Sequence, residues 1–187
     1  NAYHSFFLKS DGSLHAMGRN DKGQLGNGNT THQNYAVQIT TEVVQVATGV
    51  SHSLYLKSDG SLWAMGDNTH GQLGTGNQIQ QNAPVQIATG VIQVAAGAYH
   101  SLFIKSDGSL HTFGASSSGR LGTGDTLPQY SPVQIVASGV VQVAAGSSHS
   151  LFVKSDGSLW ASGSNSGQLG TGNTTYQPFP VQVPTGV

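Results

Sequence analysis

Four histidines recur at one position of a segment that the chain repeats four times, and imidazole is a side chain able to bind metal ions and to transfer protons near neutral pH. A ring of equivalent imidazoles around a common axis would be one way to bind a metal ion. However, no carboxylate recurs beside them and the chain has no cysteine, so the further ligands that a metal site needs are missing. We therefore interpret them as structural residues that bond to the backbone of the neighbouring repeat. They are His4, His52, His100 and His149.

Each repeat also carries a Lys-Ser-Asp-Gly turn, which places an amine close to a carboxylate. A catalytic Lys–Asp pair is not favoured, because four identical turns would make four identical active sites. Aspartate in such a turn typically bonds to the backbone two residues further on. We predict this structural role for Asp11, Asp59, Asp107 and Asp156.

No other group of residues indicates catalysis or cofactor binding. The glycine-rich run that begins at Gly71 does not open a helix, whose N-terminus a phosphate-binding loop would need. Glu42 is the sole glutamate, and no Ser-His-Asp set or pair of carboxylates stands out for acid–base work. The sequence therefore predicts no enzyme activity, no cofactor and no metal ion.

The repeated segment returns after 48, 48 and 49 residues, and self-similarity at this period indicates a repeat architecture. Each copy contains the tetrapeptide Gly-Gln-Leu-Gly, with arginine in place of glutamine in the third copy. Two glycines around a single apolar residue allow positive φ angles, so we expect each leucine to fill the core from a tight loop. These leucines are Leu25, Leu73, Leu121 and Leu169.

The second copy predicts four short strands. Residues 53–57 alternate between polar and apolar, Asp59-Gly60 is a hairpin signal, and residues 62–65 form the return strand. A third strand begins at Pro84, and residues 91–96 form a strand of small side chains suited to a crowded inner position. Four strands in about 48 residues is the size of one β-propeller blade. The fold class is therefore all-β, a propeller of four-stranded blades. On the return strand, His15 and His111 are interpreted as substitutes for Trp63 and Trp160.

Composition excludes several kinds of partner. Only 8% of the residues are charged and the net charge is −1, which gives no electrostatic basis for binding nucleic acid or an anionic membrane. No apolar run reaches 18 residues, so we expect no membrane insertion. Ser, Thr, Asn and Gln take the place of charge, which favours an extracellular or cell-surface location.

Several features recur in a fixed order through the chain. A valine strand leads into Gly-x-x-His-Ser at residues 94–101, an Asp-Gly turn follows as at Asp59-Gly60, an aromatic strand ends in glycine at residues 63–66, and Asn-x-x-Gly-Gln-Leu-Gly occupies residues 68–74. This order resembles the regulator of chromosome condensation repeat family, and the match covers essentially the whole chain. The resemblance implies a ring of about seven four-stranded blades, a scaffold that hosts many different partners.

The repeats account for four blades less one strand. The first residues match the segment from Gly97 and the last match the segment up to Val91, so residues 92–96 have no counterpart at the seam. We expect residues 1–187 to form one propeller domain of about four blades that lacks one strand between its C- and N-terminus, as part of a longer array. Further blades of the same chain, or a second copy of it, would close the ring, since unpaired strand edges favour association. A closed ring of four blades is the alternative.

The loops that differ between the copies are where we expect specificity to lie. One set follows the glycine that ends the return strand, and the other follows Gly-Gln-Leu-Gly. Aromatic side chains there offer contact area at low entropic cost, although each ring could instead pack under its own loop. The residues predicted to bind a partner are Arg19, Asp21, Tyr35, Asp67, His70, Tyr130, Tyr176 and Phe179.

These observations predict a non-catalytic scaffold that binds a protein partner through its variable loops. A glycan-binding propeller, with Trp63 and Trp160 as platforms, is the first alternative. The resemblance also admits an enzyme inhibitor similar to the bacterial propellers that inhibit β-lactamase, or a module for guanine-nucleotide exchange. Saturable sugar binding at several sites per chain would separate the glycan-binding alternative from the protein scaffold.

Overall fold

The computed structural model describes residues 3–184, which are built almost entirely of β-strands. The single helical element in this part of the chain is the 3-10 turn η1 (Ser117–Gly119). The prediction of an all-β fold is confirmed. The strands are β1 (His4–Leu8), β2 (Leu14–Gly18), β3 (Gln33–Thr40), β4 (Val43–Thr48), β5 (His52–Lys57), β6 (Leu62–Gly66), β7 (Gln81–Ala88), β8 (Val91–Ala96), β9 (His100–Lys105), β10 (Leu110–Gly114), β11 (Gln129–Val136), β12 (Val140–Ala145), β13 (His149–Lys154), β14 (Leu159–Gly163) and β15 (Gln177–Gln182).

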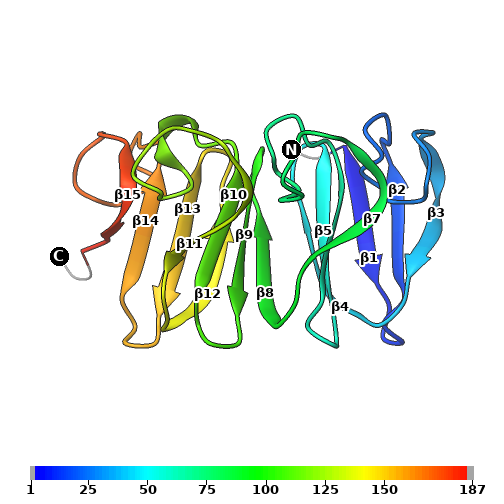
Figure 1. Ribbon diagram of the computed structural model, residues 1–187, viewed down its shortest axis with the longest axis horizontal. Coiled ribbons are helices and arrows are strands. Elements are labelled where there is room, and N and C mark those ends of the chain that lie inside the picture. Colours follow the sequence, from blue (N-terminus) through cyan, green and yellow to red (C-terminus); the bar gives the residue numbers. More distant parts are fainter. Residues whose placement is uncertain (1–2, 185–187) are drawn as a thin grey trace.

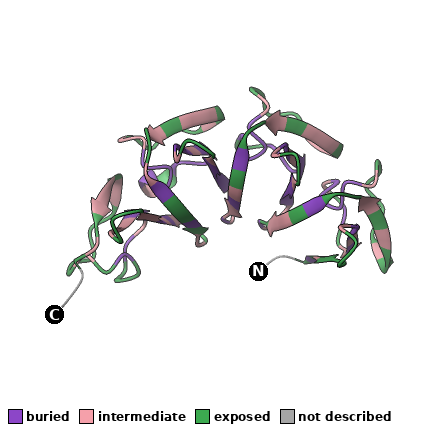
Figure 2. Ribbon diagram, turned by 90° about the horizontal axis from the view of Figure 1, so that it is seen from below, coloured by how far each residue is buried: buried purple, intermediate pink, exposed green. Residues whose placement is uncertain are grey.

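The strands form four antiparallel sheets that stand side by side along an arc (Figures 1 and 2). Blade 1 is β1–β2–β3, blade 2 is β4–β5–β6–β7, blade 3 is β8–β9–β10–β11 and blade 4 is β12–β13–β14–β15. The innermost strands β4, β8 and β12 lie against one another in sequence, whereas the last strand of each blade lies at the outer wall. This is the arrangement of propeller blades that the repeat predicts.

Apolar side chains of the two middle strands of each blade pack against those of the next blade. Leu54 and Leu62 of blade 2 pack in one cluster with Phe103 and Phe113 of blade 3. The leucine of each Gly-Gln-Leu-Gly loop closes this core from above, and none of the four is more than 1% exposed. The alternation of the strands therefore produces a core between blades, so a blade is stable only beside a neighbour.

The two ends of the blades differ in character (Figure 1). The lower end carries the short Asp-Gly hairpins, and there Asp59 Oδ1 accepts bonds from the backbone N of Ser61 (2.8 Å) and from its hydroxyl (2.6 Å). The upper end, which we call the loop face, carries the long loops and the short turns between blades. The loop face comprises residues 19–32, 49–51, 67–80, 97–99, 115–128, 146–148 and 164–176.

Adjacent blades are also joined at their inner and outer edges. At the inner edge, the Gln45 side-chain amide pairs with both the N and the O of Val94, 3.1 and 3.0 Å away, and so replaces a strand-to-strand ladder where the backbones diverge. At the outer edge, the N of Gly76 donates to the O of Tyr130 in the next blade (2.8 Å). The same outer bond joins blades 1 and 2, and blades 3 and 4.

A third connection, in the middle of the blades, uses the recurrent histidines. The Ser101 hydroxyl in blade 3 donates to the O of Gln72 in blade 2 (2.8 Å), so it accepts the Nε2–H of His52, 3.0 Å away. The same arrangement joins His4 to Ser53 and His100 to Ser150. The expectation of a backbone partner is wrong in this detail, because the serine hydroxyl stands between the imidazole and the carbonyl.

A glycine stands three residues before His52, His100 and His149, and it has a steric cause. A Cβ atom on Gly49 would lie 2.1 Å from Cε1 of His52 and 2.7 Å from the O of Gly97. No other residue type fits between the ring and the neighbouring blade. In the motif Gly-x-x-His-Ser, the glycine therefore leaves room for the imidazole, and the histidine and serine form the hydrogen bonds that join neighbouring blades.

We expect the variant Ser101→Ala to lose about 2–4 kcal/mol of unfolding free energy, because it leaves both the His52 N–H and the Gln72 carbonyl buried without a partner. Urea unfolding monitored by fluorescence measures this loss. The matched control is Ser106→Ala in the exposed hairpin of the same blade, which should change stability by less than about 0.5 kcal/mol. Equal urea midpoints for the two variants would contradict the assigned bond.

Candidate functional site

The recurrent histidines do not form a reactive site in the folded chain. Burial lowers the pKa of His52 and of His100 to about 3, and that of His4 to about 4. Their imidazoles are therefore neutral at physiological pH, and each ring spends its N–H on the serine of the next blade. Between residues 3 and 184, no cluster of three or more His, Cys, Asp or Glu side chains could hold a metal ion.

These depressed pKa values predict acid sensitivity. An unfolded histidine takes up a proton near pH 6.5, whereas His52 and His100 in the fold stay neutral down to about pH 3. Their contribution to stability is complete above pH 6.5 and is lost progressively as the pH falls toward 3. In that window, each histidine lowers the unfolding free energy by up to about 1.4 kcal/mol for every pH unit of acidification. Urea midpoints measured from pH 7 to pH 4 should fall, and His52→Gln, which cannot titrate, should show a shallower decline than the parent chain. Parallel curves for the two proteins would contradict the assignment.

The aromatic position of the return strand is also structural. His111 stacks on Phe103 at 4.9 Å just as Trp63 stacks on Tyr55 at 6.2 Å, and both ring nitrogens pair with the serine two residues earlier. His15 repeats this arrangement, so histidine replaces tryptophan as a flat ring with an N–H group. Trp160 is stacked on Phe152 and has the Lys154 amine 4.4 Å from its ring centroid. The rings proposed as sugar platforms are thus already engaged within the sheet.

Buried asparagines hold the long loops of the loop face in shape. Asn68 is fully buried, and its Nδ2 donates to the hydroxyl of Thr75 (2.9 Å) and to the carbonyls of Asn77 (2.9 Å) and Ile79 (3.2 Å). Asn20 and Asn165 hold their loops in the same way. The third loop has Ser116 there, with one bond to the Asp125 carbonyl (3.2 Å). The loops are therefore preorganised, and that of blade 3 least strongly.

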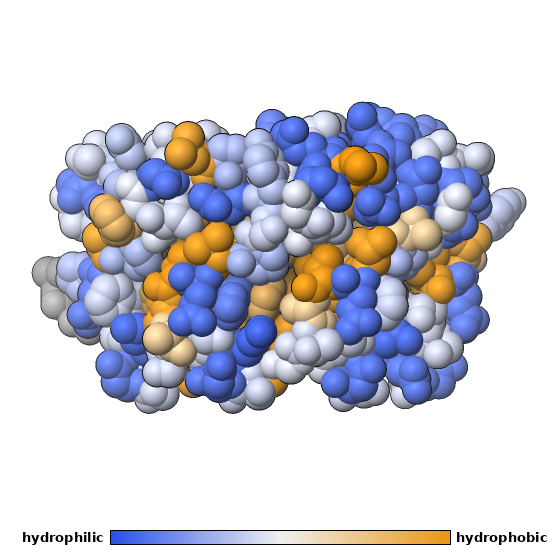
Figure 3. Space-filling model, in the orientation of Figure 1, coloured by the Kyte–Doolittle hydropathy of each residue, from blue (hydrophilic) through white to orange (hydrophobic). Residues whose placement is uncertain are grey.

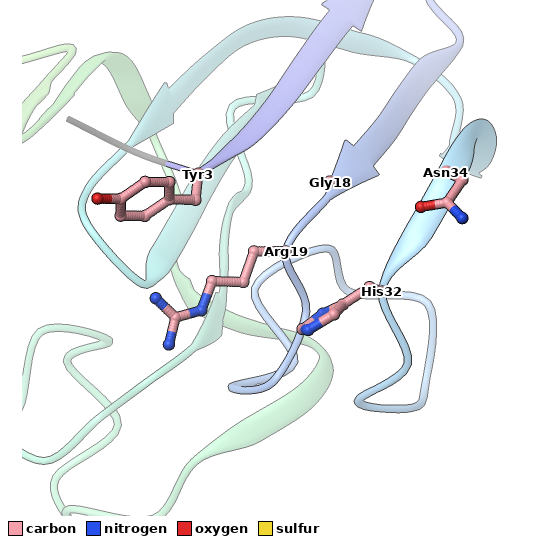
Figure 4. A pocket seen from close by; sticks show the side chains of 5 residues that line it. All are labelled: Tyr3, Gly18, Arg19, His32 and Asn34. Carbon is pink, nitrogen blue, oxygen red and sulfur yellow. The ribbon is translucent and has the colours of Figure 1, made fainter.

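A first cavity of the loop face lies in blade 1 and has a volume of about 480 Å³. Tyr3, Arg19 and His32 line it, and Figure 4 shows their side chains around one opening. Arg19 forms a bidentate pair with Asp21, at 2.6 and 2.7 Å, and its guanidinium carbon lies 5.8 Å from the centre of the Tyr3 ring. Hydrogen bonding to Arg19 lowers the pKa of Asp21. The charge of Arg19 is therefore already balanced.

A second cavity, of about 420 Å³, lies where the loop-face segments of blades 2, 3 and 4 meet. His70 from blade 2 contacts the edge of Tyr99 from blade 3 at a ring distance of 5.5 Å. Buried Arg120 and exposed Ser117 of the blade 3 loop also line it, and Ser148 lines it from blade 4. This cavity brings polar and aromatic groups of three blades into one place.

The structure places the predicted partner-binding residues in different settings. Tyr35 is 85% exposed and Phe179 is 62% exposed, and Arg19, Asp21, His70 and Tyr176 also face solvent. Asp67 is buried and accepts bonds from Thr69 and Gln72 of its own loop, so it shapes the loop. Tyr130 is 38% exposed, and its backbone lies against Gly71 where blades 2 and 3 meet.

Sequence reasoning missed three residues of the loop face. Ile79 is an exposed apolar side chain, and Tyr99 and Arg120 line the second cavity. An isolated isoleucine in a polar loop, and the one departure from Gly-Gln-Leu-Gly, were the available signals. Figure 3 shows the outer wall, where hydrophobic side chains stand singly near the loop face and more densely at mid-height.

The family model of the RCC1-like domain matches residues 1–187. The chain belongs to this family. No curated protein sequence matches it. Solved structures similar to this RCC1-like domain include human WBSCR16, with 26% identity and a TM-score of 0.86, and Prp20p from Saccharomyces cerevisiae, with 23% identity and a TM-score of 0.84.

The alignments cover 97% of this chain but only 51% of WBSCR16 and 48% of Prp20p, so the RCC1-like domain spans about half the length of these relatives. A second yeast structure, Prp20 bound to Kap60, matches with 24% identity and a TM-score of 0.81. Among the described residues, the domain has no helix of the length and apolarity that a membrane crossing requires.

Proposed function

We propose that this RCC1-like domain is a non-catalytic module that binds a protein partner through its loop face. The observation that carries the proposal is that recurrent and variable residues of the repeat occupy different environments. His4, His52, His100 and the recurrent aspartates and leucines are engaged in hydrogen bonds or core packing within and between blades. The exposed aromatic and apolar side chains of the variable loops gather on one face. The exposed apolar and aromatic side chains of this face and of the outer-strand ends beside it are Tyr3, Tyr35, Ile79, Tyr99, Leu127, Tyr130, Tyr176 and Phe179.

Two further observations support a protein as the partner. Aromatic anchors on a rigid frame are typical of protein interfaces, because little conformational entropy is lost on binding. The structure of Prp20p is described with its binding to Gsp1p and histones, and the second yeast structure is of Prp20 bound to Kap60. Nucleotide exchange on a bound partner is the second candidate, and capture of a guanine-nucleotide-binding protein in the binding experiment below would favour it.

We also propose that the open faces of blades 1 and 4 are covered by further blades or by a second copy of the chain. In blade 3, Leu102, Ile104 and Leu110 are completely buried by blade 4. Their equivalents Leu151, Val153 and Leu159 in blade 4 are half-buried and border an empty cavity of about 190 Å³. At the opposite end, Phe7 of blade 1 is 38% exposed, whereas its equivalents Tyr55, Phe103 and Phe152 in the other blades are at most 2% exposed.

Substitutions on the loop face and on the outer-strand ends beside it should weaken partner binding. The immobilised chain captures a partner from extracts of its native source, and titration with the purified partner then compares single variants. At least one of Tyr35→Ala, Leu127→Ala, Tyr176→Ala and Phe179→Ala should lose tenfold or more, because a few buried aromatic or apolar anchors carry about 2 kcal/mol or more each. The control Lys9→Ala, in an exposed hairpin of the lower end, should bind as the parent chain does. Unchanged affinity in all four variants would refute the loop face as the binding surface.

The covered-end proposal predicts self-association of the 187-residue chain. Light scattering should give a mass of at least twice 19.3 kDa, because the apolar end faces favour pairing. Leu159→Asp should shift the protein toward the single-chain mass, whereas Ile79→Asp on the loop face should not. A single-chain mass for the unaltered chain at about 100 µM would overturn this proposal.

A further inference from the structure

Arg120 is the one departure from Gly-Gln-Leu-Gly, and a second change accompanies it. In blade 2 the side chain of Gln72 donates from Nε2 to the carboxylate of Asp67 (2.9 Å). In blade 3, the equivalents of this pair are Arg120 and Ala115. The third copy therefore carries a cation where the other three copies carry glutamine, and it has no carboxylate at the position that Asp67 occupies in blade 2.

The Arg120 guanidinium is buried without a counter-charge. The residue is only 6% exposed, and burial lowers the pKa of its guanidinium. Nε donates to the Ser117 carbonyl (3.1 Å), Nη1 to the Ser147 carbonyl (3.3 Å) and Nη2 to the Ser117 hydroxyl, all neutral acceptors. No carboxylate between residues 3 and 184 lies within 4.0 Å of it. A buried charge of this kind is unfavourable until an opposite charge reaches it.

The guanidinium keeps hydrogen-bonding capacity for a ligand. It has five N–H groups, and its three bonds within the protein leave one N–H on each of the two Nη atoms. Because the Ser117 hydroxyl accepts from Arg120, its own proton is also free to be donated. Two N–H groups on one planar fork match the two oxygens of a carboxylate.

The cavity above Arg120 suits a negatively charged side chain. No Asp or Glu is among the residues that line it, and four of them, Tyr99, Ser116, Thr126 and Ser148, carry a hydroxyl group. Asp125, the only acid of this loop, is exposed and uses its carboxylate on Thr123 and on the backbone of Leu127. The His70 and Tyr99 rings also line the cavity and are both exposed, so they can contact the aliphatic part of an incoming side chain. The first cavity differs in this respect, because Asp21 already neutralises Arg19.

We propose that this cavity binds the carboxylate of an Asp or Glu side chain presented by the protein partner, with Arg120 as its counter-ion. The proposal rests on the proposed function and names the chemistry of one contact within it. The partner should therefore present an acidic residue to the junction of blades 2, 3 and 4. His70 and Tyr99 would flank that residue.

The test uses a blocked five-residue peptide of alternating glycine and aspartate, the same peptide with asparagine in place of aspartate, and inorganic phosphate at equal ionic strength. Amide and arginine Nε–H resonances of the ¹⁵N-labelled chain are followed during each titration. We expect saturable shifts at His70, Tyr99 and Arg120 with the aspartate peptide and none with the asparagine peptide.

The variant Arg120→Gln restores the residue that the other three copies carry, so the loop should keep its fold. It should weaken binding of the aspartate peptide by at least about tenfold. The matched control Lys9→Gln removes a cation from an exposed hairpin of the lower end, far from the loop face, and it should leave peptide binding unchanged.

The proposal is overturned by absence of saturable peptide binding, by equal binding of the two peptides, or by Arg120-dependent binding of phosphate alone. Failure here is distinguishable from failure of the proposed function. If the captured partner still binds with loss only in the aromatic loop variants and with none in Arg120→Gln, the interaction surface stands and the acidic contact does not.

Discussion

The architecture depends on one short connection, in which a histidine of one blade donates to a serine of the next and that serine donates back to a carbonyl of the first blade. Propeller blades have little stability alone, because their apolar faces are buried only against each other. The connection places an imidazole N–H, a serine hydroxyl and a backbone carbonyl inside this interface. The N–H donates to the hydroxyl and the hydroxyl donates to the carbonyl, so each has a partner. Its geometry leaves no room for a side chain on Gly49 or Gly97, so the glycine of the Gly-x-x-His-Ser motif is required wherever this connection forms.

This connection also explains why the most reactive residue type of the sequence does no chemistry. An imidazole that spends its N–H on a neighbour and is completely buried is held neutral, with its pKa lowered to about 3 at His52 and His100. The inner glutamine amides and the outer glycine bonds reinforce the same joint at other radii. Neighbouring blades are thus joined at their inner edge, their middle and their outer edge. The sequences of the upper loops can therefore differ between copies, and buried asparagines keep these loops ordered.

The loop of blade 3 departs most from this pattern. It has serine in place of the ordering asparagine and arginine in place of glutamine, and alanine stands at the position where blade 2 has the carboxylate of Asp67. Each change alone would be a minor variation. Together they place an uncompensated charge beneath a cavity that residues of three blades line, and so make this loop the most distinctive point of the loop face.

Much of the fold could be predicted from the sequence alone, because each pattern of strand, turn and tight loop occurs in four aligned copies. The alternation, the Asp-Gly hairpins and the tight loops around Leu73 predicted strands and turns, and the replacement of Trp63 by His111 in another copy was read correctly as a conserved ring position. These are local patterns, set by backbone geometry and the burial of alternate residues. Which surface residues face solvent together is decided by the packing of one blade against the next. That is why the meeting of His70, Tyr99 and Arg120 was visible only in the folded arc. Asp67, predicted to face a partner, is buried because its carboxylate accepts bonds from Thr69 and Gln72 once the loop has folded back on itself.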